Sequence, residues 1–275
     1  MRETVGLVKR VMAGIKRHNL SLVAAGVAYY GLLAIFPAMI AVVAIYGLVA
    51  RPDQIKKQLD PVIDQLPAGA GELISTQLTA AAELDHSGLT LGVVISLGAT
   101  LWAAAGGVRA LCKGLSMIHE REDDRSFVTK ATTALALTVA AMIAFIIALA
   151  LVAAFPVVLG HLGLGSFATG AAQVARWLLL IVLIGIGLAV LYRWGPAGER
   201  PRWRWVSWGT SVAILVWILG SVGFSVYVAN FSHYNKTYGS IAAVIVLMLW
   251  LYLSAFAVLL GAEVDTSRQP ESAKV

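Results

Sequence analysis

The sequence predicts an all-α membrane protein with six transmembrane helices. Of the 275 residues, 59% are hydrophobic and only 13% are charged, and the mean hydropathy is +0.81. A water-soluble core could not enclose so much apolar surface. The charged residues also leave six long stretches nearly free of charge. Each stretch is long enough for a helical crossing of the hydrocarbon core, which takes about 20 mostly apolar residues.

The predicted spans are residues 24–50, 88–110, 131–159, 174–193, 206–228 and 240–262. They belong to a single membrane domain, residues 1–265, followed by a short cytoplasmic tail at 266–275. Span two carries a small residue at every fourth position from Gly92 to Ala104, and such stripes let helix backbones approach closely. We therefore expect span two at the centre of the bundle. Span three, rich in alanine, isoleucine and leucine, is expected to face lipid.

The N-terminal arm, residues 1 to 20, is predicted to be an amphipathic helix rather than a span. Val5, Val8, Met12 and Ile15 fall on one helical stripe, and lysine and arginine surround the remainder. This pattern is typical of a helix that lies on an anionic membrane face.

The lysine and arginine residues predict the orientation of the bundle. Five of the 21 fall on one side, namely Arg51, Lys56, Lys57, Arg176 and Lys236. The other sixteen fall in the N-terminal arm, the second and fourth connections and the tail. Because retained cations mark the cytoplasm, both termini are expected to be cytoplasmic. The net charge of +6 is then explained by anionic phospholipid headgroups on that face of the bilayer, with no nucleic acid as partner.

The first outer connection, residues 51–87, is too long for a simple turn. Pro52 is suited to open a helix in which Ile55, Leu59 and Leu66 share a face, and the segment holds three cations against six acids. We interpret it as an outer helical hairpin that caps the mouth of the bundle. A solvated loop with no such role is an equally good interpretation.

Several polar or kink-forming residues are candidates for a translocation path or gate. In span one, Tyr29, Tyr30 and Pro37 stand where a proline bend could flank a substrate path, although such a kink equally serves packing. The short outer link between spans five and six contains Asn235, Lys236 and Tyr238. This link is either part of an outer gate or a tight helical hairpin whose polar groups satisfy exposed backbone ends.

Two further candidates, Arg109 and Glu263, lie at the cytoplasmic ends of spans two and six. Ionisable groups near a bilayer usually pair or face an aqueous cavity, so an Arg109–Glu263 contact is one hypothesis. Snorkelling of Arg109 toward the headgroups explains that residue equally well.

The sequence offers no recognisable enzyme site. None of the five histidines is paired with another at metal-ligand spacing, and neither a nucleophile elbow nor a phosphate-binding glycine loop occurs. We therefore expect no metal, no cofactor and no catalytic residues, and we do not expect an enzyme.

Several segments together resemble the YihY/BrkB family of bacterial inner-membrane proteins, formerly labelled ribonuclease BN. The segments are AAGVAYYGLLAIFP at 24–37, LWAAAGGVRAL at 101–111, Tyr192-Arg193 with Pro196, and the run from Asn230 to Glu263. The chain departs from the family where Ala103, Ala105 and Ala197 replace polar residues that the family often carries.

The resemblance implies a six-helix fold in the bacterial plasma (inner) membrane with cytoplasmic ends. Within the family the ribonuclease label is regarded as a misassignment, and some members are suspected of moving lipids or small solutes. Our leading hypothesis is a transporter or a flippase-like exporter of a lipid or small solute. The alternative is a structural or assembly protein that scaffolds partners in the membrane, and a ribonuclease is not expected.

Overall fold

The computed structural model describes residues 2–49, 86–155, 159, 166–198, 207–230 and 235–268. Within these ranges the ordered structure is entirely helical, without a β-strand. The helices are α1 (Arg2–Arg17), α2 (Leu20–Val49), α5 (His86–Ile118), α6 (Phe127–Leu149), the π-helical turn η1 (Ala150–Ala154), α8 (Ser166–Trp194), α9 (Trp208–Asn230) and α10 (Asn235–Ser267).

The six predicted spans correspond in order to α2, α5, α6, α8, α9 and α10. The third span, predicted to run to residue 159, covers both α6 and η1. The predicted N-terminal helix corresponds to α1, which ends where Asn19 adopts a left-handed conformation with φ of 49°. Asparagine tolerates this conformation better than most residues, so the chain can turn there before α2 begins. Residues 50–85, which hold nearly all of the predicted outer hairpin, lie outside the described ranges.

Four described segments are long and apolar enough to cross a membrane. They are Phe127–Val152, Ala168–Trp194, Trp208–Val228 and Val244–Ser267. A shorter apolar stretch covers Leu20–Ala34 in α2. The all-helical, membrane-spanning character of the chain is thereby confirmed, whereas the count of six spans stays a prediction.

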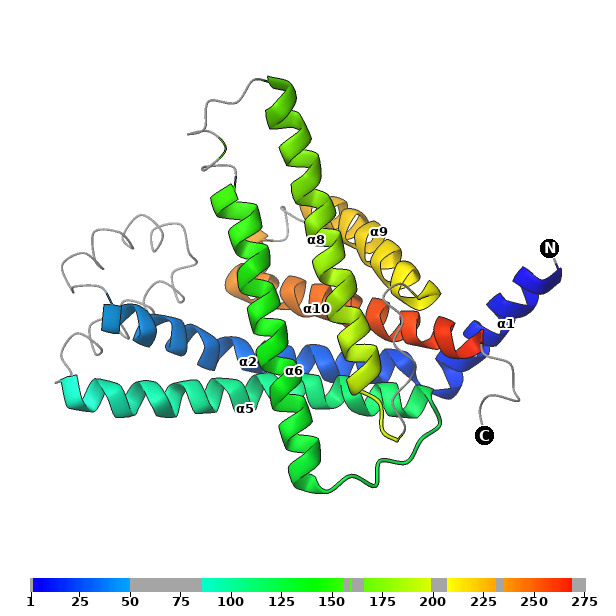
Figure 1. Ribbon diagram of the computed structural model, residues 1–275, viewed down its shortest axis with the longest axis horizontal. Coiled ribbons are helices and arrows are strands. Elements are labelled where there is room, and N and C mark those ends of the chain that lie inside the picture. The colour runs from blue at the N-terminus through cyan, green and yellow to red at the C-terminus, as the bar shows by residue number, and fades with distance from the viewer. Residues whose placement is uncertain are drawn as a thin grey trace.

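Helices α2 and α5 form one pair and α6 and α8 form another, and the two pairs cross each other (Figure 1). In this view α2 and α5 run side by side toward the left edge, while α6 and α8 rise steeply to the top. The helix α10 packs against both α9 and α2, and α5 contacts α2, α6 and α10. The central position expected for span two agrees with these contacts of α5.

Buried side chains are concentrated at one end of the bundle, which we call the base. The base comprises residues 14–28, 105–138, 188–198, 207–213 and 255–268. Of the buried residues in the described ranges, only Leu159 and Leu180 lie outside it. Its centre is a cluster of Leu20, Ala24, Leu115, Ile118, Ala255, Leu259 and Ala262. The turn between α1 and α2, the connection 119–126 and residues 195–198 after α8 all lie in the base.

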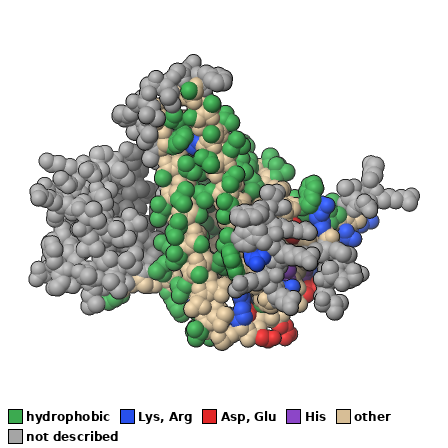
Figure 2. Space-filling view, viewed as in Figure 1, with side chains coloured by type: hydrophobic (Ala, Val, Ile, Leu, Met, Phe, Trp, Pro, Cys, Tyr) green, Lys and Arg blue, Asp and Glu red, His purple; other side chains and the backbone are tan. Residues whose placement is uncertain are grey.

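Away from the base the helices present large apolar side chains to the outside. Exposed residues of this kind lie along α6, α8 and α9. Examples are Phe145, Ile146, Val174, Leu178, Leu219 and Val222. Figure 2 shows this hydrophobic surface, with charged side chains gathered toward the lower right. Apolar surface of this extent on several helices indicates contact with lipid, in agreement with the position expected for span three.

Helix α1 carries an apolar stripe of its own. Val5, Val8 and Met12 are each more than half exposed, whereas Ile15 packs against the central cluster. The free part of the stripe suits a membrane surface, which is the environment predicted for this helix.

Candidate functional site

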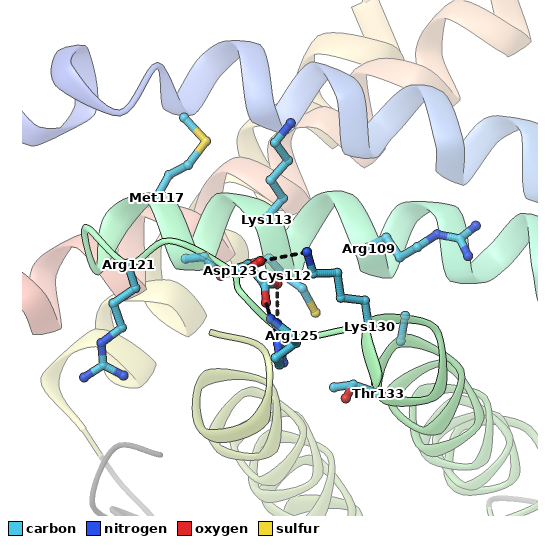
Figure 3. A pocket seen from close by; sticks show the side chains of 11 residues that line it. Arg109, Cys112, Lys113, Met117, Arg121, Asp123, Arg125, Lys130 and Thr133 are labelled. Carbon is cyan, nitrogen blue, oxygen red and sulfur yellow. Dashed lines mark hydrogen bonds and ion pairs between the residues drawn. The ribbon is translucent and has the colours of Figure 1, made fainter. Parts of the chain in front are cut away.

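A pocket of about 440 Å³ opens in the base between the end of α5, the connection 119–126 and the start of α6. We call it the basal pocket. It is lined by Arg109, Cys112, Lys113, Ser116, Met117, Arg121, Asp123, Arg125, Lys130, Thr133 and Ala134. Five of these side chains are cationic and one is a carboxylate. The lining thus holds more cationic than acidic residues. In Figure 3, Arg125 and Lys130 lie at Asp123, whereas the ends of the Arg109, Lys113 and Arg121 side chains point away from that cluster.

The end of α5 sets the direction of the connection that forms one wall of the pocket. Glu120 has φ of 53°, the amide of Glu120 donates to the carbonyl of Met117 at 3.0 Å, and Arg121 N donates to Ser116 O at 3.0 Å. These two bonds form a Schellman motif, which satisfies carbonyls at the helix end and reverses the chain. Five residues after Arg121, Ser126 caps α6 by accepting a hydrogen bond from Thr129 N at 3.3 Å.

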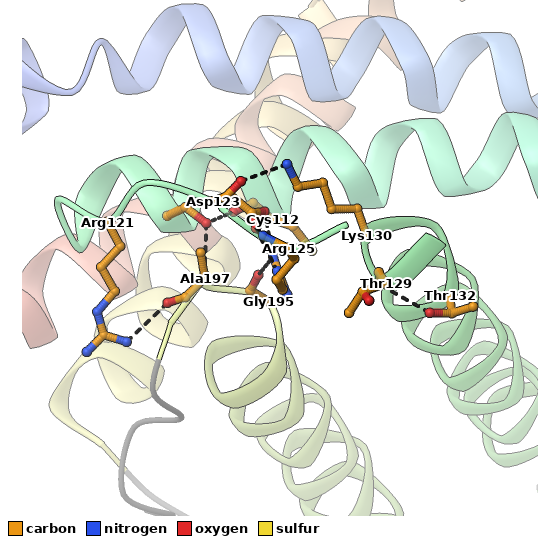
Figure 4. A network of polar contacts seen from close by, with 10 residues as sticks. Cys112, Arg121, Asp123, Arg125, Thr129, Lys130, Thr132, Gly195 and Ala197 are labelled. Carbon is orange, nitrogen blue, oxygen red and sulfur yellow. Dashed lines mark hydrogen bonds and ion pairs between the residues drawn. The ribbon is translucent and has the colours of Figure 1, made fainter. Parts of the chain in front are cut away.

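Asp123 organises the cations of this wall (Figure 4). Arg125 donates to the Asp123 carboxylate with Nε and with a terminal nitrogen, both at 2.8 Å, and Lys130 Nζ donates to the Asp123 carbonyl at 2.7 Å. The hydrogen bonds from Arg125 lower the pKa of Asp123 and raise that of Arg125. Because both carboxylate oxygens are engaged by one guanidinium, the carboxylate does not neutralise the other cations.

The connection 119–126 also forms hydrogen bonds to the turn after α8, residues 195–198. Arg121 donates to the Ala197 carbonyl at 3.1 Å, and Arg125 donates to the Gly195 carbonyl at 3.4 Å. From α5, Ser116 Oγ accepts a hydrogen bond from Ala197 N at 3.0 Å. The space at Gly195 requires glycine, since a Cβ there would lie 2.6 Å from the Leu191 carbonyl and 2.8 Å from Leu115. These contacts tie the ends of α5 and α8 together at the base.

A second polar cluster in the base is a buried pair of a histidine and a glutamate. His18 Nδ1 lies 2.8 Å from Glu263 Oε2, and the side chains of the two residues are only 9% and 4% exposed. Ser267 Oγ donates to the other carboxylate oxygen at 3.3 Å. At the surface beside this pair, Arg17 contacts Glu120. The pair connects the turn between α1 and α2 to the last turns of α10.

Residues predicted as a translocation path are separated in the structure. Tyr29 and Tyr30 are neighbours on α2, both half-exposed, with ring centroids 5.6 Å apart in an edge-to-face arrangement. Tyr30 lies beside α5, where a Cβ at Gly106 would be 3.0 Å from its ring. Arg109 lines the basal pocket and Glu263 belongs to the buried pair with His18. Two of the eight candidates thus lie at the base.

Four other candidates lie at positions where only the backbone is described. Pro37 falls inside α2, and the helix continues past it to Val49. Asn235, Lys236 and Tyr238 form the first turn of α10. Residues 231–234 of the predicted outer link lie outside the described ranges. A role of these residues in an outer gate therefore stays a prediction.

The hypothesis of an Arg109–Glu263 contact is wrong. The guanidinium of Arg109 turns back along its own helix, donates to the Trp102 carbonyl at 3.2 Å and stacks 4.7 Å from the Trp102 ring. Glu263 instead faces α1, where a Cβ at Gly14 would overlap with its carboxylate. The absence of a side chain at Gly14 lets the carboxylate reach His18, which serves as its partner.

Sequence reasoning overlooked His18, Lys113 and the Asp123–Arg125 pair as members of a site. His18 and Glu263 are 245 positions apart, so no local spacing connects them. Apart from Arg109, the cations of the basal pocket were assigned to orientation alone. A usable signal was the alternation of Arg121, Asp123 and Arg125 in a short connection, because a carboxylate between two arginines indicates a local network.

Within the described ranges, no group of three or more histidine, cysteine, aspartate or glutamate side chains is arranged to hold a metal ion.

The fold and its apolar surface define an all-helical membrane protein. The chain belongs to the virulence factor BrkB family, whose family model matches residues 11–274. This match confirms the resemblance drawn from the sequence motifs. No solved structure matches the chain.

Two relatives match the chain along most of its length. The putative ribonuclease-like protein YfkH of Bacillus subtilis (strain 168) is 29% identical over 270 residues, which cover 95% of this chain and 94% of that protein. A UPF0761 membrane protein of Xanthomonas oryzae pv. oryzae (strain PXO99A) is 28% identical over 264 residues, covering 92% of this chain. The match covers 59% of that relative, so the chain spans little more than half of its length.

A UPF0761 membrane protein of Tolumonas auensis (strain DSM 9187 / NBRC 110442 / TA 4) is 38% identical over 86 residues, covering 31% of this chain and 28% of that protein.

Proposed function

We propose that the protein is a multi-pass transporter or flippase-like exporter of a lipid or small solute in the bacterial inner membrane. The uneven packing of the bundle supports this proposal. Buried side chains gather in the base, while the α2–α5 and α6–α8 pairs run in different directions away from it (Figure 1). Two helix pairs that diverge from a common packed base could rock against each other, as groups of helices do in an alternating-access cycle.

The orientation that goes with this proposal has the base in the cytoplasm. Lys113, Arg121, Arg125 and Lys130 lie at the base, as does Arg268, which stacks 4.6 Å from the Trp208 ring. Retained cations favour the cytoplasmic side, and tryptophan favours the membrane interface. Both α1 and the end of α10 reach the base, so both termini would be cytoplasmic.

A scaffold that holds partner helices in the membrane is the second candidate function. The exposed apolar side chains of α8 and α9 favour it, because they would also suit helix–helix contacts with another membrane protein. In either role we propose no enzymatic activity, and in particular no ribonuclease activity.

Reconstitution into liposomes tests the leading proposal. Purified protein in vesicles that carry fluorescent lipids, or a panel of trapped solutes, should move at least one of these compounds across the bilayer. Vesicles without protein and vesicles with an unrelated six-helix protein serve as controls. Movement equal to that of the controls for the whole panel, from protein that is folded and correctly inserted, would overturn the transport proposal in favour of the scaffold.

A topology experiment tests the orientation separately. In a Cys112→Ala background, cysteine is introduced at Ser272 in the tail or at Ser75 in the first outer connection. A membrane-impermeant maleimide should label intact spheroplasts at position 75 but not at position 272. The reverse labelling pattern would contradict cytoplasmic termini.

A further inference from the structure

Building on the proposed transport function, we propose that the basal pocket binds the phosphate group of an anionic lipid taken from the cytoplasmic leaflet. This pocket would be the place where the substrate is loaded. The inference rests on the charge, the size and the surroundings of the pocket.

The charge of the pocket selects an anion. Its cationic residues come from three elements: Arg109 and Lys113 from α5, Arg121 and Arg125 from the connection, and Lys130 from α6. Of these, Arg109 donates to the Trp102 carbonyl and Arg121 to the Ala197 carbonyl. The carboxylate of Asp123 is occupied by Arg125, and Lys130 reaches only the backbone carbonyl of Asp123. Among the described residues, Lys113 forms no hydrogen bond or ion pair, and it is exposed. A bound anion would supply the missing counter-charge.

The chemistry of the cations fits a phosphate. A guanidinium can donate two hydrogen bonds to phosphate oxygens, and an ammonium provides a compact point charge beside them. The volume of about 440 Å³ lies in the range of small-ligand pockets, which is roughly 300–1,000 Å³. It therefore has room for a phosphate together with a small polar headgroup and bound water.

The surroundings of the pocket favour a phosphate that is attached to a lipid. Met117 lines the pocket and is 39% exposed, and Phe127 lies one turn from Lys130 on α6 and is 73% exposed. At the other end, Arg109 stacks on Trp102, which is 54% exposed. Polar lining and exposed apolar side chains thus lie next to each other. An amphiphile could place its headgroup in the pocket and its acyl chains against the apolar surface of α6.

Native mass spectrometry of the full-length protein in detergent tests the inference directly. The probes are dioctanoyl phosphatidylglycerol, the zwitterionic dioctanoyl phosphatidylcholine, and glycerol 3-phosphate as the headgroup without chains. We expect the anionic lipid to bind at least fivefold more tightly than either of the others. Glycerol 3-phosphate that binds as tightly as the anionic lipid would overturn the assignment to a lipid. Equal binding of the two lipids would overturn the selection for net negative charge.

Substitutions then locate the binding site. Lys113→Gln and Arg109→Gln should each weaken binding of the anionic lipid at least fivefold. Arg176→Gln removes the same charge from α8, on the predicted outer side and outside the pocket, and should leave the affinity unchanged. Arg109→Gln serves as a second pocket variant in case Lys113→Gln fails to fold. Unchanged affinity in folded pocket variants, or an equal loss in Arg176→Gln, would overturn the pocket as the site.

The outcomes separate this inference from the transport proposal. Anionic lipid bound at the pocket of a protein that moves nothing across liposomes would leave the site standing and refute transport. Transport that continues unchanged in Lys113→Gln and Arg109→Gln would support the transport function and refute the pocket as the place where the substrate is loaded.

Discussion

At the scale of single residues, the buried pair of His18 and Glu263 is the contact with the largest expected effect on stability. A carboxyl group that is only 4% exposed needs a hydrogen-bonding partner, because burying a polar group without one costs free energy. His18 Nδ1 and Ser267 Oγ supply that partnership from two different elements. Removal of the His18 side chain or of the Glu263 side chain would leave the other one buried without this hydrogen-bonding partner.

We predict that His18→Ala and Glu263→Ala each lower the free energy of unfolding by about 3 kcal/mol, the size expected when one member of a buried pair is removed. The double variant should be less destabilised than the sum of the single variants, with a coupling of about 1–3 kcal/mol. Thermal unfolding of the purified variants in detergent measures these values.

The matched control for this cycle is Arg109→Ala combined with Glu263→Ala. These two residues have different partners, so their effects should add to within about 0.5 kcal/mol. Additive losses for His18 and Glu263, or strong coupling between Arg109 and Glu263, would contradict the pairing described above.

His119 gives the base a dependence on pH. Its Nδ1 donates to the Leu115 carbonyl at 2.8 Å, and burial lowers its pKa below the ordinary 6.5 by favouring the neutral ring. Above pH 6.5 the ring is neutral in both the folded and the unfolded protein. As the pH falls below 6.5, the unfolded protein takes up the proton first, so stability is lost.

The protein should therefore become less stable between pH 6.5 and pH 5, by at most about 1.4 kcal/mol per pH unit from this residue. His119→Gln has no proton to gain and should show a flatter profile over the same interval. Melting temperatures of both proteins from pH 5 to pH 8 check this prediction. Parallel profiles would show that His119 does not contribute.

At the scale of elements, close approach of α9 and α10 depends on two glycines. A Cβ at Gly209 would overlap with the Gly261 carbonyl, and a Cβ at Gly261 would lie 2.5 Å from the Gly209 carbonyl. The approach also lets the Asp265 carboxylate accept a hydrogen bond from Gly209 N at 2.7 Å at the start of α9. Because an acidic side chain at a helix N-terminus satisfies a free amide, α10 caps its neighbour.

We predict that Gly209→Ala destabilises the protein by about 1–3 kcal/mol, since the added methyl group forces the two backbones apart. Gly223→Ala is the matched control on the same helix, because nothing lies within 4 Å of a Cβ at that position. That substitution should be neutral or stabilising by up to about 1 kcal/mol, owing to the better helix propensity of alanine. Equal effects at the two positions in thermal unfolding would argue against a close α9–α10 contact.

Most of the elements could be predicted from the sequence, because length and apolar character determine which segments become long helices in a membrane. The ends of the helices were less predictable. Span two was expected to end at residue 110 and span six at 262, but α5 continues to Ile118 and α10 to Ser267. The predicted ends were placed where charged residues such as Lys113 and Glu263 interrupt the apolar stretches of spans two and six. The helices nevertheless continue, because these residues line the basal pocket or pair within the base.

At the scale of the whole molecule, the base joins contributions from every described α-helix. Its polar contacts depend on residues brought together from distant parts of the chain, such as His18 with Glu263 and Ser116 with Ala197. A single sequence shows the charges but not which of them meet, so the candidate site could be predicted only in part. Arg109 and Glu263, two of the predicted candidates, both lie in the base, but their partners there depend on tertiary packing.

If the protein is a transporter, the base must open during each cycle to admit substrate from the cytoplasm. A covalent link across the base should therefore stop transport. Ser116 Oγ accepts a hydrogen bond from Ala197 N at 3.0 Å, so the two residues are close enough for a cysteine pair to be tested as a disulfide. We predict that Ser116→Cys/Ala197→Cys, in a Cys112→Ala background, loses transport in liposomes on oxidation.

Addition of a reductant should restore transport in the double variant. The two single-cysteine variants control for the substitutions themselves and should transport equally under oxidising and reducing conditions. The extent of crosslinking is followed by mass spectrometry of the peptides that contain positions 116 and 197. A fully crosslinked protein that transports at the rate of its reduced form would show that α5 and the turn after α8 do not separate. The opening would then have to occur elsewhere in the base.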